Sequence, residues 1–236
     1  MMDDREEIIH NRKLLLCPTT EDWSAPELLR ECPQCHNFLL YCCACNKRLV
    51  SLPRSRRQAN PCHHFRIIFT DGACTNNGRP EAKAGVGVAY GNDAASQLSI
   101  SITDLADDFP VRSNQRAELY AAIVGLEFLA EADEINSHEQ TGKPKDQAEA
   151  WIIATDSEYV VKGMTEWLPK WRRNNWCTSK GTKPVNLDLF LALDVLMTKH
   201  EARNFKVGFW RIPREHNELA DRLAKAAAVN GHVATT

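Results

Sequence analysis

The chain has 236 residues, of which 43% are hydrophobic and 25% charged, and its formal net charge at pH 7 is −2. This length allows one full domain with its own core and a small appendage, and the near-neutral charge excludes a uniformly basic nucleic-acid binder. No apolar run approaches the roughly 18 residues that a membrane-spanning helix needs. The acidic opening, MMDDREEIIH, lacks the features of a signal or transit peptide, so we expect a cytosolic or nuclear protein that is not secreted.

Cysteine is concentrated at the front of the chain. Seven of the nine cysteines lie within the first 62 residues. Without an export signal, such clustering indicates metal binding rather than disulfides. The sequences CPQC and CCAC supply two C-x₂-C pairs, Cys32 with Cys35 and Cys42 with Cys45, which together match a four-thiolate zinc site. We therefore predict a small cysteine-rich, zinc-binding module over residues 1–45.

Other ligand sets remain open to the sequence. The six-residue gap between the two pairs is shorter than the usual spacing of a zinc ribbon. The side chains that could substitute are Cys17, Cys43, Cys62, His36, His63 and His64. The alternative is a set of reduced thiols without metal. A structural zinc would supply folding free energy that so short a region lacks.

A basic linker is predicted over residues 46–62. Its stretch NKRLVSLPRSRRQAN contains five basic residues and no acidic one. This composition is typical either of an exposed tether or of a tether that contacts nucleic acid.

From residue 63 to 232 the pattern is that of a mixed α/β domain. Short apolar runs broken by turn residues predict strands at 65–71, 84–91, 96–103, 150–156 and 205–212. The first three are expected to form an antiparallel meander. Helices are expected at 113–132, after Ser157, at about 186–200 and at about 217–231. The first of these has helical spacing of apolar residues and a cap at Ser113 or Asn114, and a polar loop is expected at 133–149.

Four acidic residues occupy special places in these elements. Two strands each end in Thr-Asp, at Asp71 and Asp156, so neighbouring strands would bring both carboxylates to one edge of the sheet. Glu118 and Asp221 lie in the first turns of helices. Four gathered carboxylates repel one another unless cations compensate, and hard oxygen ligands select Mg²⁺ or Mn²⁺. Taken singly, each is better explained as a surface or capping residue, and the case for a metal site depends on their number and on their placement at strand ends.

The segments that carry these acids resemble a known family. FTDGACTNNG, SNQRAEL, ATDSEYVVKGMTEWLPKWRRNNW and NELADRLAKAA are similar, in order, to the four blocks of the type 1 ribonuclease H family, over about residues 65–230. The resemblance implies a ribonuclease H-like five-stranded mixed sheet flanked by helices. It also implies endonucleolytic hydrolysis of the RNA strand of RNA–DNA hybrids by two Mg²⁺ or Mn²⁺ ions, leaving 5′-phosphate and 3′-hydroxyl ends. The implied catalytic metal ligands are Asp71, Glu118, Asp156 and Asp221.

The same resemblance implies a set of substrate contacts. Those to the RNA strand and its 2′-hydroxyls are Cys74, Asn77, Asn114 and Gln115. The three amides also suit turn and cap chemistry. The implied contacts to the DNA strand are Tyr159, Trp171, Ser113 and Asn186, the last two in a phosphate pocket. The stretch 167–183 has five basic residues and three tryptophans, and its residues Lys170, Arg172 and Arg173 are expected on phosphates, while Trp167 is expected in the core.

The chain departs from the family at one catalytic position. Many members carry a loop histidine ten residues before the last aspartate, where this sequence has Arg211. His216 is the candidate replacement, and a surface residue at a helix start is the alternative. Two rival functions follow: a non-catalytic hybrid-binding or scaffold protein that keeps the fold, and a metal nuclease that acts on structured DNA. Retention of all four acids argues against the first, and the three amides argue against the second.

Overall fold

The computed structural model describes residues 9–43, 46, 63–136 and 149–230. The strands are β1 (Ile9–His10), β2 (Lys13–Leu14), β3 (Leu29–Glu31), β4 (Phe38–Leu40), β5 (Phe65–Thr75), β6 (Lys83–Ala89), β7 (Gln97–Ile102), β8 (Ala150–Thr155) and β9 (Lys206–Arg211). The helices are α1 (Ala25–Leu28), α3 (Asn114–Asn136), α4 (Glu158–Lys162), α5 (Leu168–Arg173), α6 (Leu187–Glu201) and α7 (Glu218–Asn230). Short turns are the 3₁₀ segments η2 (Ala94–Ser96) and η4 (Arg214–His216) and the π-helical turn η3 (Gly163–Trp167).

One mixed sheet organises the described residues. Its strand order is β1-β2-β9-β8-β5-β4-β3, with β6 beside β5 and β7 beside β6. Strands β5, β6 and β7 form the antiparallel meander that the sequence predicts, and β5, β8 and β9 run parallel. These five strands and their flanking helices confirm the predicted fold class. The other four strands are short additions from the N-terminal segment.

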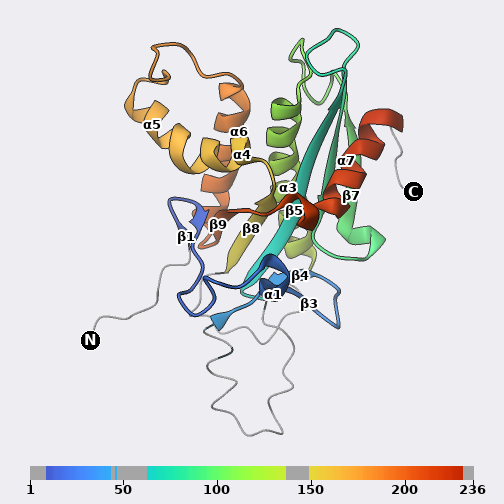
Figure 1. Cartoon of the computed structure of the whole chain (residues 1–236), viewed down its shortest axis with the longest axis vertical. Helices are drawn as coiled ribbons and strands as arrows, with labels where there is room; N and C mark the ends of the chain where they lie inside the picture. Colours follow the sequence, from blue (N-terminus) through green and yellow to red (C-terminus); the bar gives the residue numbers. More distant parts are fainter. Residues whose placement is uncertain (1–8, 44–45, 47–62, 137–148, 231–236) are drawn as a thin grey trace, which may run out of the picture.

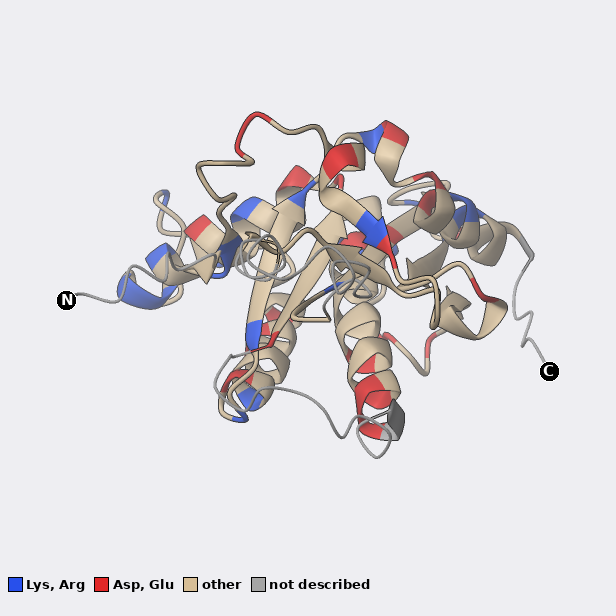
Figure 2. Ribbon diagram, turned by 90° about the horizontal axis from the view of Figure 1, so that it is seen from below, with Lys and Arg blue, Asp and Glu red and all other residues tan. Residues whose placement is uncertain are grey.

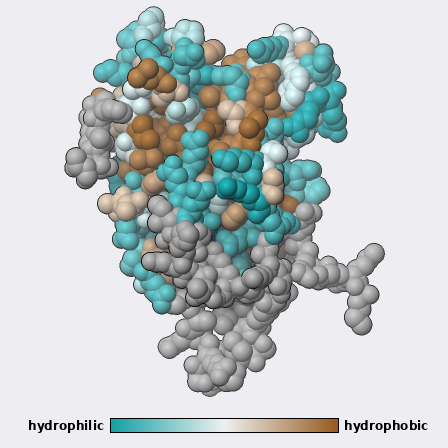
Figure 3. Space-filling view, turned by 180° about the vertical axis from the view of Figure 1, so that it is seen from behind, coloured by the Kyte–Doolittle hydropathy of each residue, from teal (hydrophilic) through white to brown (hydrophobic). Residues whose placement is uncertain are grey.

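Helices cover both faces of the five central strands (Figure 1). α3 packs on β5 and β6 and meets α6, while α7 crosses β5, β6 and β7. Fully buried side chains such as Leu119, Leu126, Trp151 and Phe190 share one apolar core. Seen from behind, apolar residues gather in the upper half of the molecule between hydrophilic regions (Figure 3). Among the described residues, no helix is both long and apolar enough to cross a membrane.

The N-terminal segment extends the central sheet. β2 pairs in parallel with β9 through Lys13 and Phe209, and β4 pairs antiparallel with β5 through Leu39 and Arg66. Between these contacts the segment runs across the sheet (Figure 1) and shares a second core with it. The members of this core include Leu14, Leu28, Leu40, Phe65, Ile67, Phe69 and Ile152. The cysteine-rich segment is thus packed on the strands of the α/β domain, because both present apolar side chains that neither could bury alone.

Two predicted boundaries were wrong. Asp71 does not end its strand: β5 continues to Thr75, because Asp71 pairs with Gly87 inside the β5–β6 hairpin. α3 also runs to Asn136 and takes up the start of the predicted polar loop. The remainder of that loop, 137–148, lies outside the described residues, as do 44–45 and 47–62, which contain most of the predicted linker together with Cys45 and Cys62.

Candidate active site

Two aspartates lie side by side on neighbouring parallel strands. β5 and β8 pair with Phe69 opposite Ala154, and the same register carried two residues further sets Asp71 beside Asp156. Adjacent strands are about 4.8 Å apart, and residues in register point to the same face of the sheet. The sequence therefore predicts this pair correctly, although Asp156 follows the end of its strand and Asp71 lies within its own.

Two helices bring the other carboxylates to the same place. α3 approaches β5 closely because Gly72 has no side chain; a Cβ there would lie 2.2 Å from the backbone of α3. In consequence the Gly72 amide donates to Oε2 of Glu118 at 3.3 Å. α7 approaches β6 in the same way, since a Cβ on Gly87 would lie 2.1 Å from the carbonyl oxygen of Ala220, next to Asp221. The two glycines set the depth at which Glu118 and Asp221 enter the site.

The four carboxylates share one electrostatic environment. Asp71 is 6% exposed. Burial raises its pKa to about 7, and the charges of Asp156 and Asp221 add to the effect. Burial also raises the pKa of Glu118 well above its usual range, with further contributions from Asp71 and Asp156. Each buried acid therefore senses the others, as expected when like charges converge without a cation.

Basic and amide side chains hold two of these acids in place. Arg214 and Lys225 contact the two carboxylate oxygens of Asp221, at 3.3 and 2.7 Å. The Asn217 side chain, 1% exposed, donates to Oδ1 of Asp156 at 2.8 Å and to the carbonyl oxygen of Thr70 at 3.1 Å. Sequence reasoning places Asn217 only at a helix start. Its link to Asp156 spans 61 residues, so no local pattern could have revealed it.

This donor set fits divalent cations. All four groups are carboxylates, the ligands that Mg²⁺ and Mn²⁺ prefer, and a bound cation would relieve the repulsion that raises the pKa of Asp71 and of Glu118. Within the described residues, no three of the four acids bring one oxygen each within 4.8 Å of one another.

The predicted RNA-contacting residues lie around the start of α3. The Asn77 side chain accepts a hydrogen bond from the Asn114 amide at 3.1 Å, which joins the β5–β6 turn to the helix N-terminus. Asn114 and Gln115 are exposed, and Cys74 is partly buried on β5. Both the turn-and-cap role and the substrate role are compatible with this geometry, because the exposed amides remain accessible.

The predicted DNA-contacting residues form a second group. Asn186, at the start of α6, donates to the Tyr159 hydroxyl at 3.2 Å. Ser113 caps α3 by accepting from the Arg116 amide at 3.3 Å, and the Arg116 guanidinium lies 3.5 Å from the Asn186 side chain. Ser113 and Asn186 thus belong to one connected network. Arg116 itself pairs with Asp107 at 2.6 Å.

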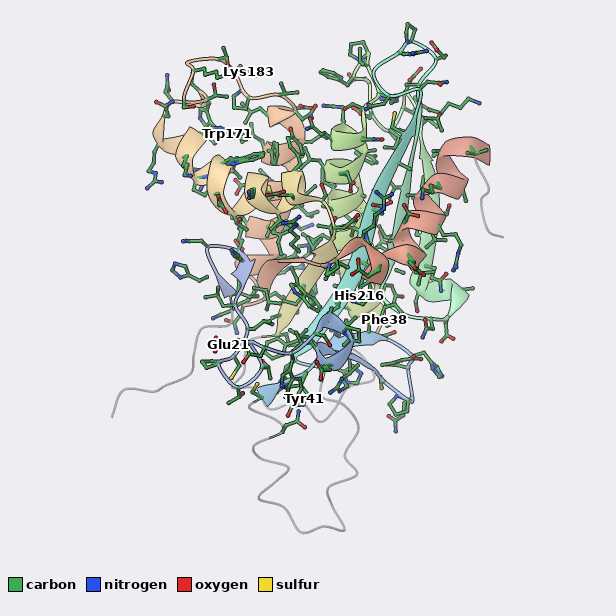
Figure 4. The ribbon with its side chains drawn as sticks, viewed as in Figure 1. Glu21, Phe38, Tyr41, Trp171, Lys183 and His216 are labelled. Carbon is green, nitrogen blue, oxygen red and sulfur yellow. The ribbon has the colours of Figure 1, made fainter. Side chains whose placement is uncertain are left out.

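Helix α5 presents the predicted basic surface. Lys170, Arg172 and Arg173 are exposed, and the blue of basic residues gathers on this helix at the left of Figure 2. Trp171, labelled in Figure 4, is partly buried, and its ring centre lies 5.2 Å from that of Phe190. Arg172 also bonds Asp194 at 2.6 Å. Core packing and a basic face therefore coexist in this segment, and Trp167 is half-buried against Trp171.

His216 lies beside the N-terminal segment. Together with Leu29, Phe38 and Phe69 it lines a cavity of about 360 Å³, and Figure 4 shows it next to Phe38. Asn217 lines the same cavity. His216 is thus adjacent in the chain to a residue that contacts Asp156, while its own surroundings are largely apolar. Its catalytic role stays a prediction.

The predicted zinc ligands are regrouped in the structure. Cys32 and Cys35 lie together, but their third neighbour is His63, and the three ligand atoms are within 4.8 Å of one another. Cys42 instead has its sulfur 3.9 Å from Nδ1 of His64. Cys45 falls outside the described residues.

The sequence is similar to that of known proteins over most of its length. Residues 64–229 match the RNase H family. The chain is 37% identical over 166 residues to Ribonuclease H of Cyanothece sp., a match that covers 68% of this chain and 87% of that protein. It is 30% identical over 180 residues to human Ribonuclease H1, covering 75% of this chain but only 54% of the human protein.

A solved structure supports the fold alone. The foamy viral protease-reverse transcriptase in complex with RNA/DNA hybrid superposes with a TM-score of 0.50 at 18% identity, over 76% of this chain and 22% of that one. The family match spans most of the chain and contains all four acids of the site. The chain therefore belongs to the RNase H family, as a ribonuclease H.

Proposed function

We propose that this protein hydrolyses the RNA strand of RNA–DNA hybrids endonucleolytically, with two Mg²⁺ or Mn²⁺ ions, and leaves 5′-phosphate and 3′-hydroxyl ends. The observation that carries the proposal is the convergence of Asp71, Glu118, Asp156 and Asp221 around one end of β8. Four mutually repelling carboxylates are costly to keep, and a purely hybrid-binding scaffold has no use for them.

The chain's own residues prepare the site for such ions. Asp71 and Asp156 present their carboxylates in register, Asn217 fixes the orientation of Asp156, and the Gly72 amide fixes Glu118. Two bound ions would supply an activated water and would stabilise the leaving 3′ oxygen. No protein nucleophile is needed, so none of these side chains has to form a covalent intermediate.

Strand discrimination is assigned to the two surfaces described above. Recognition of RNA requires contacts to the 2′-hydroxyl, which the amides of Asn77, Asn114 and Gln115 can supply together with the partly buried Cys74. We assign contacts with phosphates of the DNA strand to the exposed basic residues of α5. This division would let the protein hold a hybrid with its RNA strand over the carboxylates.

A cleavage assay on an end-labelled RNA–DNA hybrid tests this function. Mg²⁺-dependent cuts should be confined to the RNA of the hybrid and absent from matched RNA–RNA and DNA–DNA duplexes. Asp71→Asn should lower the rate by on the order of 1,000-fold or more, the scale of losing several kcal/mol of charge stabilisation in the transition state. The 3′ ends of the products should be extendable by a polymerase without phosphatase treatment.

Asp108→Asn is the matched control. Asp108 is an exposed carboxylate in the loop before α3, and its change should leave the rate within about twofold of the native value. Binding of the hybrid without any cleavage would move the protein to the scaffold class. Cuts in structured DNA, with the hybrid left intact, would instead identify the protein as a metal nuclease that acts on structured DNA.

A further inference from the structure

The turn between β3 and β4 brings two sulfurs to one side. The Cys32 amide donates to the carbonyl oxygen of Asn37 at 3.0 Å, and the His36 amide donates to the carbonyl oxygen of Cys32 at 2.9 Å. His36 adopts a left-handed conformation with φ of 53°, which lets the chain turn back sharply. Both cysteines are free thiols in the structure.

His63 reaches this turn from a distant part of the sequence. It lies just before β5, next to which β4 pairs through Leu39 and Arg66. Its Nε2 is 3.3 Å from the sulfur of Cys35, across 28 residues of sequence. The sulfurs of Cys32 and Cys35 and one imidazole nitrogen of His63 all lie within 4.8 Å of one another.

We propose that these three side chains bind a Zn²⁺ ion that joins the β3–β4 turn to the start of β5. With Zn–S bonds of about 2.3 Å and Zn–N bonds of about 2.0 Å, tetrahedral ligands lie roughly 3.5–3.8 Å apart. The observed separations need only small side-chain adjustments to reach that spacing. Thiolate and imidazole are the ligands that zinc prefers. Cys32 is fully buried and Cys35 is exposed, so a fourth ligand, from a further side chain or from water, would complete the tetrahedron on the open side.

Such an ion would act as a crosslink in the fold. It would tie the N-terminal segment to the strand that carries Asp71, and would stabilise the fold because it binds the folded state rather than the unfolded chain. It is chemically distinct from the carboxylate site, whose oxygen ligands select harder cations. The zinc site therefore goes beyond the proposed nuclease function and can fail or succeed independently of it.

Zinc content of the full-length protein, purified with its thiols reduced, tests the proposal. We expect about one zinc per chain, retained in Asp71→Asn and in Cys177→Ser, a partly exposed cysteine in the segment after α5. His63→Ala should weaken zinc binding by at least about 100-fold in competition with a chromogenic chelator, because loss of a supporting residue alone costs 10–100-fold. His63→Cys should restore binding, since a thiolate can replace the imidazole.

Zinc removal from the native protein provides a test that does not depend on variants. A zinc-selective chelator at constant Mg²⁺ should lower Tm by roughly 5–10 °C, and added Zn²⁺ should restore it. Native protein without zinc would overturn the proposal. So would full zinc affinity in His63→Ala, which would return the assignment to thiolates alone, or a Tm that the chelator leaves unchanged.

Discussion

At the scale of single residues, Asp71 shows how the site departs from an ordinary surface carboxylate. Burial and the nearby charges of Asp156 and Asp221 raise its pKa from 3.8 to about 7. A folded-state pKa above the unfolded value means that ionisation opposes folding. Without bound cation, this carboxylate therefore destabilises the protein at neutral pH, as expected of a group that is proposed to hold a cation.

The pH dependence of stability should reveal that cost. In Mg²⁺-free buffer, Asp71→Asn should match the native Tm only well below the unfolded pKa of 3.8, where the carboxyl is protonated in both states. Its advantage should grow as pH rises from 4 to 7 and then level off. The shift of roughly three pKa units, at about 1.4 kcal/mol each, bounds the gain at about 4 kcal/mol. Thermal melts across this pH range measure it.

Added Mg²⁺ supplies the control for this experiment. At pH 8 it should raise the Tm of the native protein and leave Asp71→Asn nearly unchanged, since the variant has lost a ligand. A variant that is equally or less stable than the native protein at pH 8 in Mg²⁺-free buffer would show that Asp71 is not strained by its neighbours.

At the scale of helices and strands, the central elements could be predicted from local pattern. Apolar runs mark β5, β8 and β9, helical spacing marks α3, and their order brings Asp71 and Asp156 together. The extension of β5 beyond Asp71 could not be predicted from local pattern, because it depends on pairing with β6 rather than on the sequence of β5. Strands of two or three residues, such as β1 and β3, are too short to show a period.

The parts that sequence reasoning missed are contacts between distant residues. Asn217 reaches Asp156 across 61 residues, and His63 reaches Cys35 across 28. The cysteine spacing favoured four thiolates and offered His63 only as one of six possible substitutes, whereas the sheet brings its imidazole to the same turn. Both cases depend on the tertiary fold, which a local pattern does not carry.

The close approach of α3 to β5 makes Gly72 a test of element packing. In Gly72→Ala the new Cβ would lie 2.2 Å from the α3 backbone, so the helix has to move and carry Glu118 with it. We expect a loss of about 1–3 kcal/mol in stability and of roughly 100-fold in hybrid cleavage, since a displacement of about 1 Å has that effect on a reacting site. Denaturant unfolding and the cleavage assay measure the two losses.

Gly181→Ala is the comparison for that variant. Gly181 has a positive φ of 75° but open space around its Cβ position, so only backbone strain of about 1 kcal/mol is expected, with cleavage unaffected. Equal activity in the two glycine variants would show that α3 can shift without moving Glu118 out of place.

At the scale of the whole molecule, the N-terminal segment contacts α6 and β9 as well as β5. Arg12, in the β1–β2 turn, donates to Asp194 at 2.6 Å and to both carboxylate oxygens of Glu201 at 3.0 and 2.8 Å. The Arg12 carbonyl oxygen also accepts from the Phe209 amide at 2.7 Å. Because Asp194 bonds Arg172 of α5 too, one carboxylate connects the front of the chain to the basic surface.

This fastening predicts that a change at the front of the chain destabilises the entire fold. Arg12→Ala should cost about 1–3 kcal/mol, because it removes the bidentate partner of Glu201 and leaves Asp194 with only the more exposed Arg172. It should lower Tm by about 2–4 °C per kcal/mol in one cooperative transition. Arg12→Lys should recover only part of the lost stability, since an ammonium cannot reproduce the bidentate contact with Glu201. Arg203→Ala, which removes an exposed pair with Glu134, should cost less than about 0.5 kcal/mol. A native-like main transition in Arg12→Ala, preceded by a separate small one, would instead show that the N-terminal segment unfolds independently of the nuclease domain.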